Sequence, residues 1–316
     1  MFKGRFSSNT GVIGVDFGAT AIRLLQLRNN NGTLQLIGAA RIDNPASLKT
    51  PASLTQEIKA AFLSGDFSGS RCIVSLPRTE LRVQSIRLPK MPDDELRQSI
   101  SWEASQRFDL PREAMQCDFI RTGASLQGGE QREELLILAV SHKAINACVE
   151  PLIEAGLRPV AIDAGFTAIA RGFSRQYRRE SDRAVVRTIL DIGVTSSNIL
   201  ILRGDQIAFC KTVNIGGQHL DQAVAEHLRI DLNAATELRS ARIVEKVGSP
   251  DTCPLTDLST DRAVYEAVRP LMGDLVREIV LSHRYYGVTF RGHPPQHVVL
   301  TGGNGLEPHL DEAVST

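Results

Sequence analysis

The chain has 316 residues, of which 42% are hydrophobic and 23% are charged, a composition typical of folded globular proteins and not of disordered or fibrous ones. Lys plus Arg and Asp plus Glu both number 36, so the net charge indicates neither nucleic-acid binding nor an acidic substrate. The longest apolar run, near residues 135–140, is far shorter than the roughly 20 residues of a membrane-spanning helix. At roughly 150 residues per domain, the length predicts two lobes.

The residues before position 11 and the cysteines indicate a reducing compartment. Residues 1–10 are polar and basic and contain no apolar signal-peptide core, which predicts a cytoplasmic location. The cysteines are scattered and form no CxxC pair, so we expect reduced thiols that pack in the interior, without disulfides or a metal site. They are Cys72, Cys117, Cys148, Cys210 and Cys253.

The start of the chain predicts a three-stranded meander followed by a helix and a fourth strand. Tight turns are expected at 17–19 and at 29–32, because Asn and Gly tolerate the positive φ of short hairpins. The strands are expected over 12–16, 21–27, 34–42 and 72–76, and the helix over 53–63.

From Pro77 onward the pattern changes to that of a small α+β insertion. Asp93 is expected to cap a helix that carries Leu96, Ile100 and Ala104 at four-residue spacing. The other expected elements are an alternating segment over 81–88, strands over 117–122 and 134–140 separated by a polar loop over 123–132, and a helix over 144–155.

The second half repeats the opening pattern. A strand over 157–163 and a helix over 166–173 lead to a second meander over 188–213, with its turn at 203–206. Helices are expected over 219–228 and from Asn233, followed by a long amphipathic helix. The apolar stripe of that long helix contains Val264, Val268, Leu271, Leu275, Ile279 and Ser282. A last strand over 297–300 precedes Thr301-Gly302-Gly303.

Two segments align without a gap. DFGATAIRLLQLR (Asp16–Arg28) and DIGVTSSNILILR (Asp191–Arg203) share an Asp, a Gly, a Thr, a Leu and a final Arg. The spacing between the copies is that of a domain and not of a solenoid repeat. The repeat therefore predicts two lobes of common origin.

The repeated motif has residues suited to a phosphate group. Glycine turns let backbone N–H groups approach an anion, and Thr20, Thr195 and Ser196 add hydroxyl donors. Asp16 and Asp191 could hold the waters of a Mg²⁺ ion that bridges the phosphates. One D-x-G-x-T copy also occurs in ordinary hairpins. Two copies in matching strands, followed by Gly216-Gly217 after the second meander and by Thr301-Gly302-Gly303 after the last strand, predict a nucleotide-binding protein.

The order of these motifs resembles the actin-like ATPases, which include actin, the DnaK-type chaperones and FtsA, and within them the PilM proteins of type IV pilus assembly. The similar segments are Ser75-Leu76-Pro77, Leu88-Pro89, Trp102-Glu103-Ala104 with Gln106 and Pro111, Leu135–Val140, Glu154–Val160, Gly216-Gly217-Gln218 and Tyr285-Tyr286. The resemblance extends from about residue 11 to 310. It implies an α/β actin-like ATPase fold: two lobes related by duplication, with an inserted FtsA-like α+β subdomain in the first lobe.

The resemblance also implies the domain boundaries. Residues 10–76 and 157–184 would form the first lobe, 77–156 the inserted subdomain, 185–215 and 288–316 the core of the second lobe, and 216–287 its smaller subdomain.

The resemblance further implies an ATP and Mg²⁺ site. Phosphate and magnesium contacts would come from Asp16, Gly18, Ala19, Thr20, Asp191, Gly193, Thr195 and Ser196, ribose contacts from Gly216 and Gly217, and adenosine contacts from Gly302 and Gly303.

Two departures from the family pattern favour ATP binding over hydrolysis, so at most a weak ATPase is expected. Gly165 stands where PilM-like chains commonly have a Glu, which leaves Asp163 as the nearby acid. Asp163 could orient the attacking water, or it could serve only as a cap or as part of the structure of the connecting segment. Thr236 replaces the purine-contacting Glu of the chaperones, while Arg239 retains a basic group for the nucleotide.

The function implied by the resemblance is a cytoplasmic ATP-binding scaffold at the inner face of the cytoplasmic membrane. Its partners would be the N-terminal cytoplasmic peptide of a PilN-like membrane protein and other proteins of the pilus platform. The alternatives are an actin-like module of a type II secretion platform, an FtsA-like filament-forming division protein, and a small-molecule kinase of the same superfamily.

Overall fold

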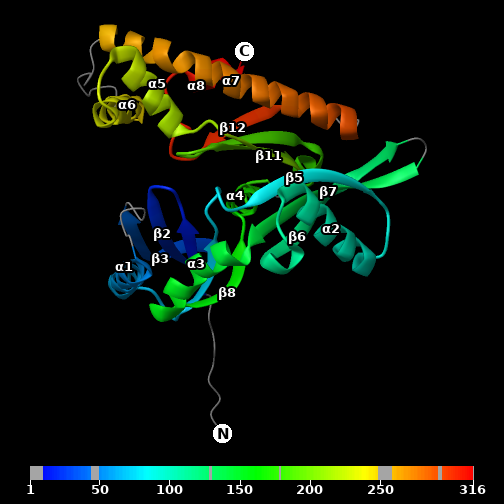
Figure 1. The fold of residues 1–316 in the computed structure, drawn as a ribbon. Coiled ribbons are helices and arrows are strands. Elements are labelled where there is room, and N and C mark those ends of the chain that lie inside the picture. Colours follow the sequence, from blue (N-terminus) through cyan, green and yellow to red (C-terminus); the bar gives the residue numbers. More distant parts are fainter. Residues whose placement is uncertain are drawn as a thin grey trace. The chain divides into compact units, whose positions relative to one another are not determined.

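The computed structural model describes residues 10–43, 50–127, 130–177, 179–247, 258–290 and 294–315 (Figure 1). Cys253 and residues 1–9 of the N-terminal segment lie outside these ranges. The chain forms two compact units: Met1–Arg82, Asp93–Asp118 and Leu138–Ile169 make up the first, and Val83–Pro92, Phe119–Ile137 and Ala170–Thr316 the second. Among the described residues, no helix has both the length and the apolar composition needed to cross a membrane.

The first unit contains a five-stranded sheet in the order β3-β2-β1-β4-β8. Its strands are β1 (Ile13–Phe17), β2 (Ala21–Asn30), β3 (Thr33–Asp43), β4 (Arg71–Ser75) and β8 (Arg158–Asp163). The first three form the predicted antiparallel meander, and β4 and β8 add to β1 in parallel. Alternate residues of β1 are buried, and they pack against α1 (Pro51–Ser64) and α3 (His142–Glu154).

The second unit repeats this arrangement. Its four-stranded sheet has the order β11-β10-β9-β12, an antiparallel meander of β9 (Val186–Ile192), β10 (Ser197–Arg203) and β11 (Gln206–Val213) with β12 (His297–Thr301) added to β9 in parallel. All seven residues of β9 are buried. The matching order of the two sheets confirms the duplication that the sequence repeat predicted.

Helices cover this second sheet (Figure 1). They are α5 (Gly217–Leu228), α6 (Leu232–Val247), α7 (Leu258–Phe290) and α8 (Leu310–Ser315), and α4 (Gly165–Ser174) precedes β9. Five residues of the predicted stripe on α7 are buried, and Leu271 is partly buried in the same core. The amphipathic pattern therefore identified the buried face of the longest described helix.

The insertion contains β5 (Arg82–Pro89), α2 (Asp93–Phe108), β6 (Met115–Gln127) and β7 (Glu130–Ser141), with sheet order β5-β7-β6. The prediction of a polar loop over 123–132 was wrong, because both strands continue into it. Backbone pairing does not require apolar side chains, and buried polar contacts replace them here: Glu134 accepts hydrogen bonds from the Ser125 hydroxyl (2.5 Å) and from Arg87. Asp93, the expected cap, is the first residue of α2.

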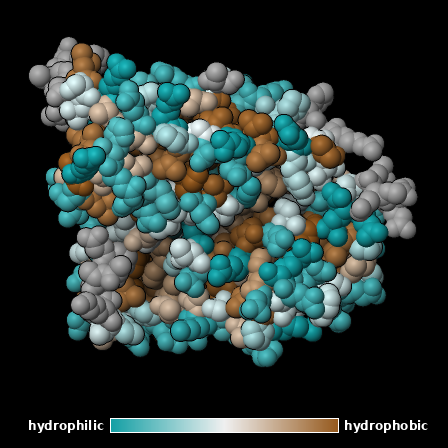
Figure 2. All heavy atoms as spheres, turned by 45° about the horizontal axis from the view of Figure 1, so that its top comes forward, coloured by the Kyte–Doolittle hydropathy of each residue, from teal (hydrophilic) through white to brown (hydrophobic). Residues whose placement is uncertain are grey.

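Hydrophilic side chains are interspersed with apolar ones over the face drawn in Figure 2. This mixture agrees with the balanced composition of the sequence. The distribution of side chains on this face therefore does not single out a functional surface.

Candidate functional site

The two copies of the repeat form turns of the same geometry. In the first, Gly18 N–H donates to the Ala21 carbonyl at 3.0 Å, and in the second, Gly193 N–H donates to the Ser196 carbonyl at 3.0 Å. Each bond encloses two loop residues, as in a two-residue β-hairpin. The sequence repeat is therefore also a repeat of backbone structure.

The first turn combines an exposed acid with an arginine. Asp16 pairs across the sheet with Arg23, and the Arg23 guanidinium lies 3.5 Å from the Asp16 carboxylate. Both side chains are about half exposed, at 51% and 48%. A Cβ on Gly18 would lie 2.9 Å from Arg23 Nη1, so the guanidinium lies over the turn. Arg23 was not among the residues expected from the sequence, although its position seven residues after Asp16 makes it the cross-turn partner.

The second turn is bonded to the first turn of α5. The Gly193 carbonyl accepts from Gly217 N–H at 2.9 Å, and the Val194 carbonyl accepts from Gln218 N–H at 2.9 Å. Gly216, the N-cap residue of α5, approaches so closely that a Cβ there would lie 2.5 Å from the Val194 carbonyl oxygen. The turn therefore presents its carbonyl groups to the helix.

These bonds direct two N–H groups away from α5. In a trans peptide the C=O and the following N–H point in opposite directions. Because the carbonyls of Gly193 and Val194 face α5, the N–H groups of Val194 and Thr195 face away from it, and neither has a hydrogen-bond partner in the described part of the chain. Two adjacent N–H groups of this kind form a small anion-binding cradle.

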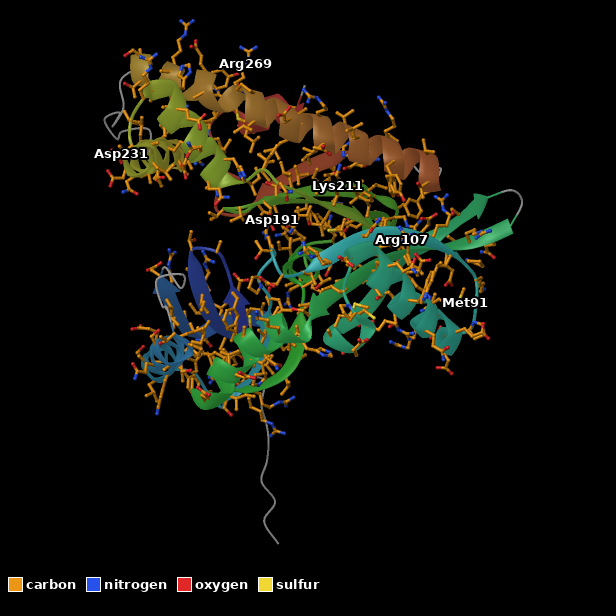
Figure 3. The ribbon with its side chains drawn as sticks, viewed as in Figure 1. Met91, Arg107, Asp191, Lys211, Asp231 and Arg269 are labelled. Carbon is orange, nitrogen blue, oxygen red and sulfur yellow. The ribbon has the colours of Figure 1, made fainter. Side chains whose placement is uncertain are left out.

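The predicted glycines near the end of β12 border the same turn. Gly302 has φ +87°, and a Cβ there would lie 2.6 Å from Asp191 Oδ1, so the backbone passes directly over this carboxylate. Asp191 is 2% exposed and lies where β9 ends, beside the start of α5 (Figure 3). A Cβ added to Gly303 would meet no heavy atom of the described residues within 4 Å, so that side of the backbone is open.

Asn304 is a further residue of this region that the sequence analysis missed. Its amide nitrogen donates to the Gly193 carbonyl at 3.0 Å, and its amide oxygen accepts from Arg239 Nη2 at 2.7 Å. Arg239 is 3% exposed and also donates to the Gly217 carbonyl, to Asp221 and to Glu307. The Asn following the Gly-Gly pair was the available signal in the sequence.

Glu307 joins Arg239 to a second arginine. It is 1% exposed and accepts from Arg239 Nε at 3.0 Å and from Arg242 Nη1 at 3.3 Å. Arg242 in turn donates to Asp261 on α7 at 2.6 Å. A continuous network, buried except at Asp261 and Asn304, thus runs from α7 through α6 to the second turn.

Asp163 lies at the end of β8, where it contacts the start of α4. Its Oδ1 accepts from Ala164 N–H at 2.9 Å and from the Thr167 hydroxyl. These contacts join the end of β8 to the first turn of α4. Thr236, the residue in place of the purine-contacting Glu, is exposed, and its hydroxyl donates to the Leu232 carbonyl at 2.9 Å.

The residues of the second turn suit a phosphate group. Two adjacent N–H donors, the Thr195 side chain and an open backbone at Gly303 can receive an anion, and the buried Asp191 carboxylate is the type of group that holds a metal's waters. Of the predicted residues in the second unit, the structure brings Asp191, Gly193, Thr195, Ser196, Gly216, Gly217, Gly302 and Gly303 to this turn. Their roles toward a nucleotide stay predictions.

Comparisons with known proteins agree with the observed fold. One chain of a PilM-PilN type IV pilus biogenesis complex is 25% identical over 96% of this chain and 86% of that chain, with a TM-score of 0.76. The ethanolamine utilization protein EutJ from Carboxydothermus hydrogenoformans is 14% identical over 96% and 80%, with a TM-score of 0.52. A diol dehydratase-reactivating factor, solved in its nucleotide-free form, is 9% identical over 96% and 93%, with a TM-score of 0.52.

The last two similarities concern the fold alone, which is that of the actin-like ATPases. No curated protein sequence gives a significant match to this chain. The family model described as type IV pilus assembly protein PilM matches residues 14–316. The chain therefore belongs to the PilM family of type IV pilus assembly proteins.

Proposed function

We propose that this protein is an ATP-binding scaffold of the type IV pilus assembly platform and that it binds the N-terminal cytoplasmic peptide of a PilN-like membrane protein. Membership of the PilM family supports the role in pilus assembly. The similarity to a chain from a PilM-PilN complex supports the choice of partner. Attachment through such a partner would hold the protein at the inner face of the cytoplasmic membrane, with other platform proteins nearby.

The observation that carries the nucleotide proposal is the pair of N–H groups at Val194 and Thr195, which face away from α5. Bound ATP would supply a polyphosphate, and Mg²⁺ would compensate part of its charge. In the second unit, Gly193, Thr195 and Ser196 would contact phosphate, Gly216 and Gly217 ribose, and Gly302 and Gly303 adenosine. In the first unit, Gly18, Ala19 and Thr20 would contact phosphate. Asp16 and Asp191 would contact magnesium through water.

Calorimetric titration with ATP tests this proposal, with and without Mg²⁺. We expect saturable binding that Mg²⁺ strengthens, and we expect Asp191→Asn to remove most of the Mg²⁺ dependence, because an amide loses the charge that holds the metal's waters. Asp205→Asn, in the exposed turn between β10 and β11, is the matched control. Absence of ATP binding by the folded wild-type protein would refute the proposal.

Hydrolysis is expected to be weak at most. The contacts of Asp163 with Ala164 and Thr167 support a structural role in the connecting segment over a role as the base that orients water. Phosphate release that is unchanged in Asp163→Ala, in a protein that still folds and binds ATP, would agree with the structural role. A large loss of release at unchanged ATP affinity would instead indicate the catalytic role.

The partner is tested with a synthetic peptide of the N-terminal cytoplasmic segment of a PilN-like protein. We expect the peptide to bind in a pull-down and in fluorescence anisotropy, while a scrambled peptide of the same composition does not bind. Equal retention of the two peptides, with and without ATP, would exclude this partner. The subdomain boundaries proposed above, with residues 77–156 as the insertion, guide the choice of truncated proteins for mapping the contact.

A further inference from the structure

We infer that Asn304, held by Arg239 and Glu307, is a positioning residue that sets the direction of the N–H group at Val194, one of the two that face away from α5. Under this inference Arg239 acts through Asn304, in contrast to the direct nucleotide contact that its position in the family pattern implies. The inference rests on the proposed ATP binding and adds to it a mechanism by which α6 and α7 influence the phosphate turn.

The orientation of the Asn304 amide is determined by its partners. A guanidinium can only donate hydrogen bonds, so the atom 2.7 Å from Arg239 Nη2 must be the amide oxygen. The amide nitrogen then faces the Gly193 carbonyl, 3.0 Å away, which can only accept. Arg239 therefore selects the amide orientation that donates to the turn.

The Gly193 carbonyl receives two hydrogen bonds, one from Asn304 and one from Gly217 N–H at 2.9 Å. Both bonds hold this peptide plane with its oxygen toward α5. The N–H of Val194 belongs to the same plane and must point the opposite way. Removing the Asn304 donor leaves one bond to hold the plane, so the N–H direction becomes less defined.

Arg239 itself has little freedom to move toward a ligand. It is 3% exposed, and its three guanidinium nitrogens donate to Asp221, Glu307, Asn304 and the Gly217 carbonyl. The Glu307 carboxylate, which is 1% exposed, neutralises the charge of this guanidinium at its Nε side. A contact with the purine would require breaking several buried charge-assisted bonds, each among the stronger hydrogen bonds in proteins.

The same hydrogen-bond network connects α6 and α7 to the second turn. Asp261 on α7 contacts Arg242, Arg242 contacts Glu307, and Glu307 contacts Arg239. These residues lie within one unit of the fold. A shift of α7 would therefore act on the same peptide plane as the loss of Asn304.

The test compares Asn304→Ala and Asn304→Asp with wild type for binding of ATP and of adenosine. We expect both variants to bind ATP roughly tenfold more weakly, as for the loss of one hydrogen bond, with adenosine affinity unchanged because adenosine has no phosphate. Asn304→Asp retains an acceptor for Arg239 and removes the donor to Gly193. Asn233→Asp, an exposed site on α6, controls for the added charge.

Two results would overturn the inference: ATP affinity unchanged in Asn304→Ala, or ATP and adenosine affinities reduced equally in that variant. The first result, if Asn304→Asp still bound ATP more weakly, would indicate an electrostatic effect, and the second would indicate a general structural role.

Amide hydrogen exchange without nucleotide separates this inference from the proposed function. We expect faster exchange at Gly217 and Gln218 in Asn304→Ala, because the turn that accepts their hydrogen bonds is less firmly held. If wild type binds no ATP, the proposed function fails while this measurement still decides the inference. Unchanged exchange at both residues would overturn it.

Discussion

Replacing Gly216 by alanine is the most direct test of the packing between α5 and the second turn. Gly216 has φ −150° and ψ −177°, an extended conformation that any residue can adopt, so the substitution introduces no backbone strain. The new Cβ would instead lie 2.5 Å from the Val194 carbonyl oxygen and 2.6 Å from the Ser196 nitrogen. Both are backbone atoms, which cannot rotate away.

The size of the effect follows from these distances. A carbon and a carbonyl oxygen normally approach to about 3.3 Å, so α5 and the turn would have to separate by roughly 0.8 Å. The two hydrogen bonds from Gly217 and Gln218, both 2.9 Å, would then stretch to roughly 3.7 Å, beyond the usual limit. At about 1 kcal/mol for each bond, we expect a loss of about 2 kcal/mol in the free energy of unfolding.

Urea unfolding followed by circular dichroism measures this loss, and ATP titration measures its effect on the proposed site. The control is Gly273→Ala on α7, where a Cβ meets no atom of the described residues within 4 Å. Glycine within a helix costs stability relative to alanine, so the control should be stabilised by about 0.5–1 kcal/mol. A Gly216→Ala protein as stable as wild type would refute the packing argument.

Three further predictions concern buried groups. Burial lowers the pKa of His283 below its ordinary value of 6.5, so the folded state disfavours the proton. The stability that His283 contributes should be full above about pH 6.5 and should fall as the pH drops toward the lowered pKa. The urea midpoints measured at about pH 8 and about pH 5.5 should therefore differ less in His283→Gln than in wild type. An equal difference in the two proteins would contradict this prediction. Burial raises the pKa of the Cys72 and Cys148 thiols to about 11. Iodoacetamide should therefore modify the partly exposed Cys117 before Cys72 and Cys148, as peptide mass spectrometry would show, and early modification of Cys72 would count against the described core. Glu307→Gln removes the carboxylate that the buried Arg239 and Arg242 guanidinium groups share, and it should lower the free energy of unfolding by about 3 kcal/mol. A loss below about 1 kcal/mol in urea unfolding would show that the network is not important for stability.

The sequence by itself determined the architecture around the repeat. The Asp-x-Gly-x-Thr copies and their flanking apolar alternation predicted two meanders with matching turns. Short-range backbone bonds, such as Gly18 N–H to Ala21 and Gly193 N–H to Ser196, form those turns. Residues that contact one another within a few positions leave a local pattern, and that pattern can be recognised in one sequence.

The extent of β6 in the polar part of the insertion was harder to predict, because it leaves no such local pattern. Residues 123–127 have no apolar alternation, yet they extend β6, where buried contacts such as Ser125 to Glu134 replace apolar packing. A strand held by its neighbours and by polar side chains has no period-two signal.

Only the tertiary structure decided the surroundings of the second turn. Asn304 and Gly193 are 111 positions apart, and Arg239 and Glu307 are 68 apart. Nothing local in the sequence distinguishes a buried, fully bonded arginine from one that is free to contact a ligand. The glycines and acids of the turn could be read from their motif, whereas the orientation of its N–H groups depends on partners that the fold brings together.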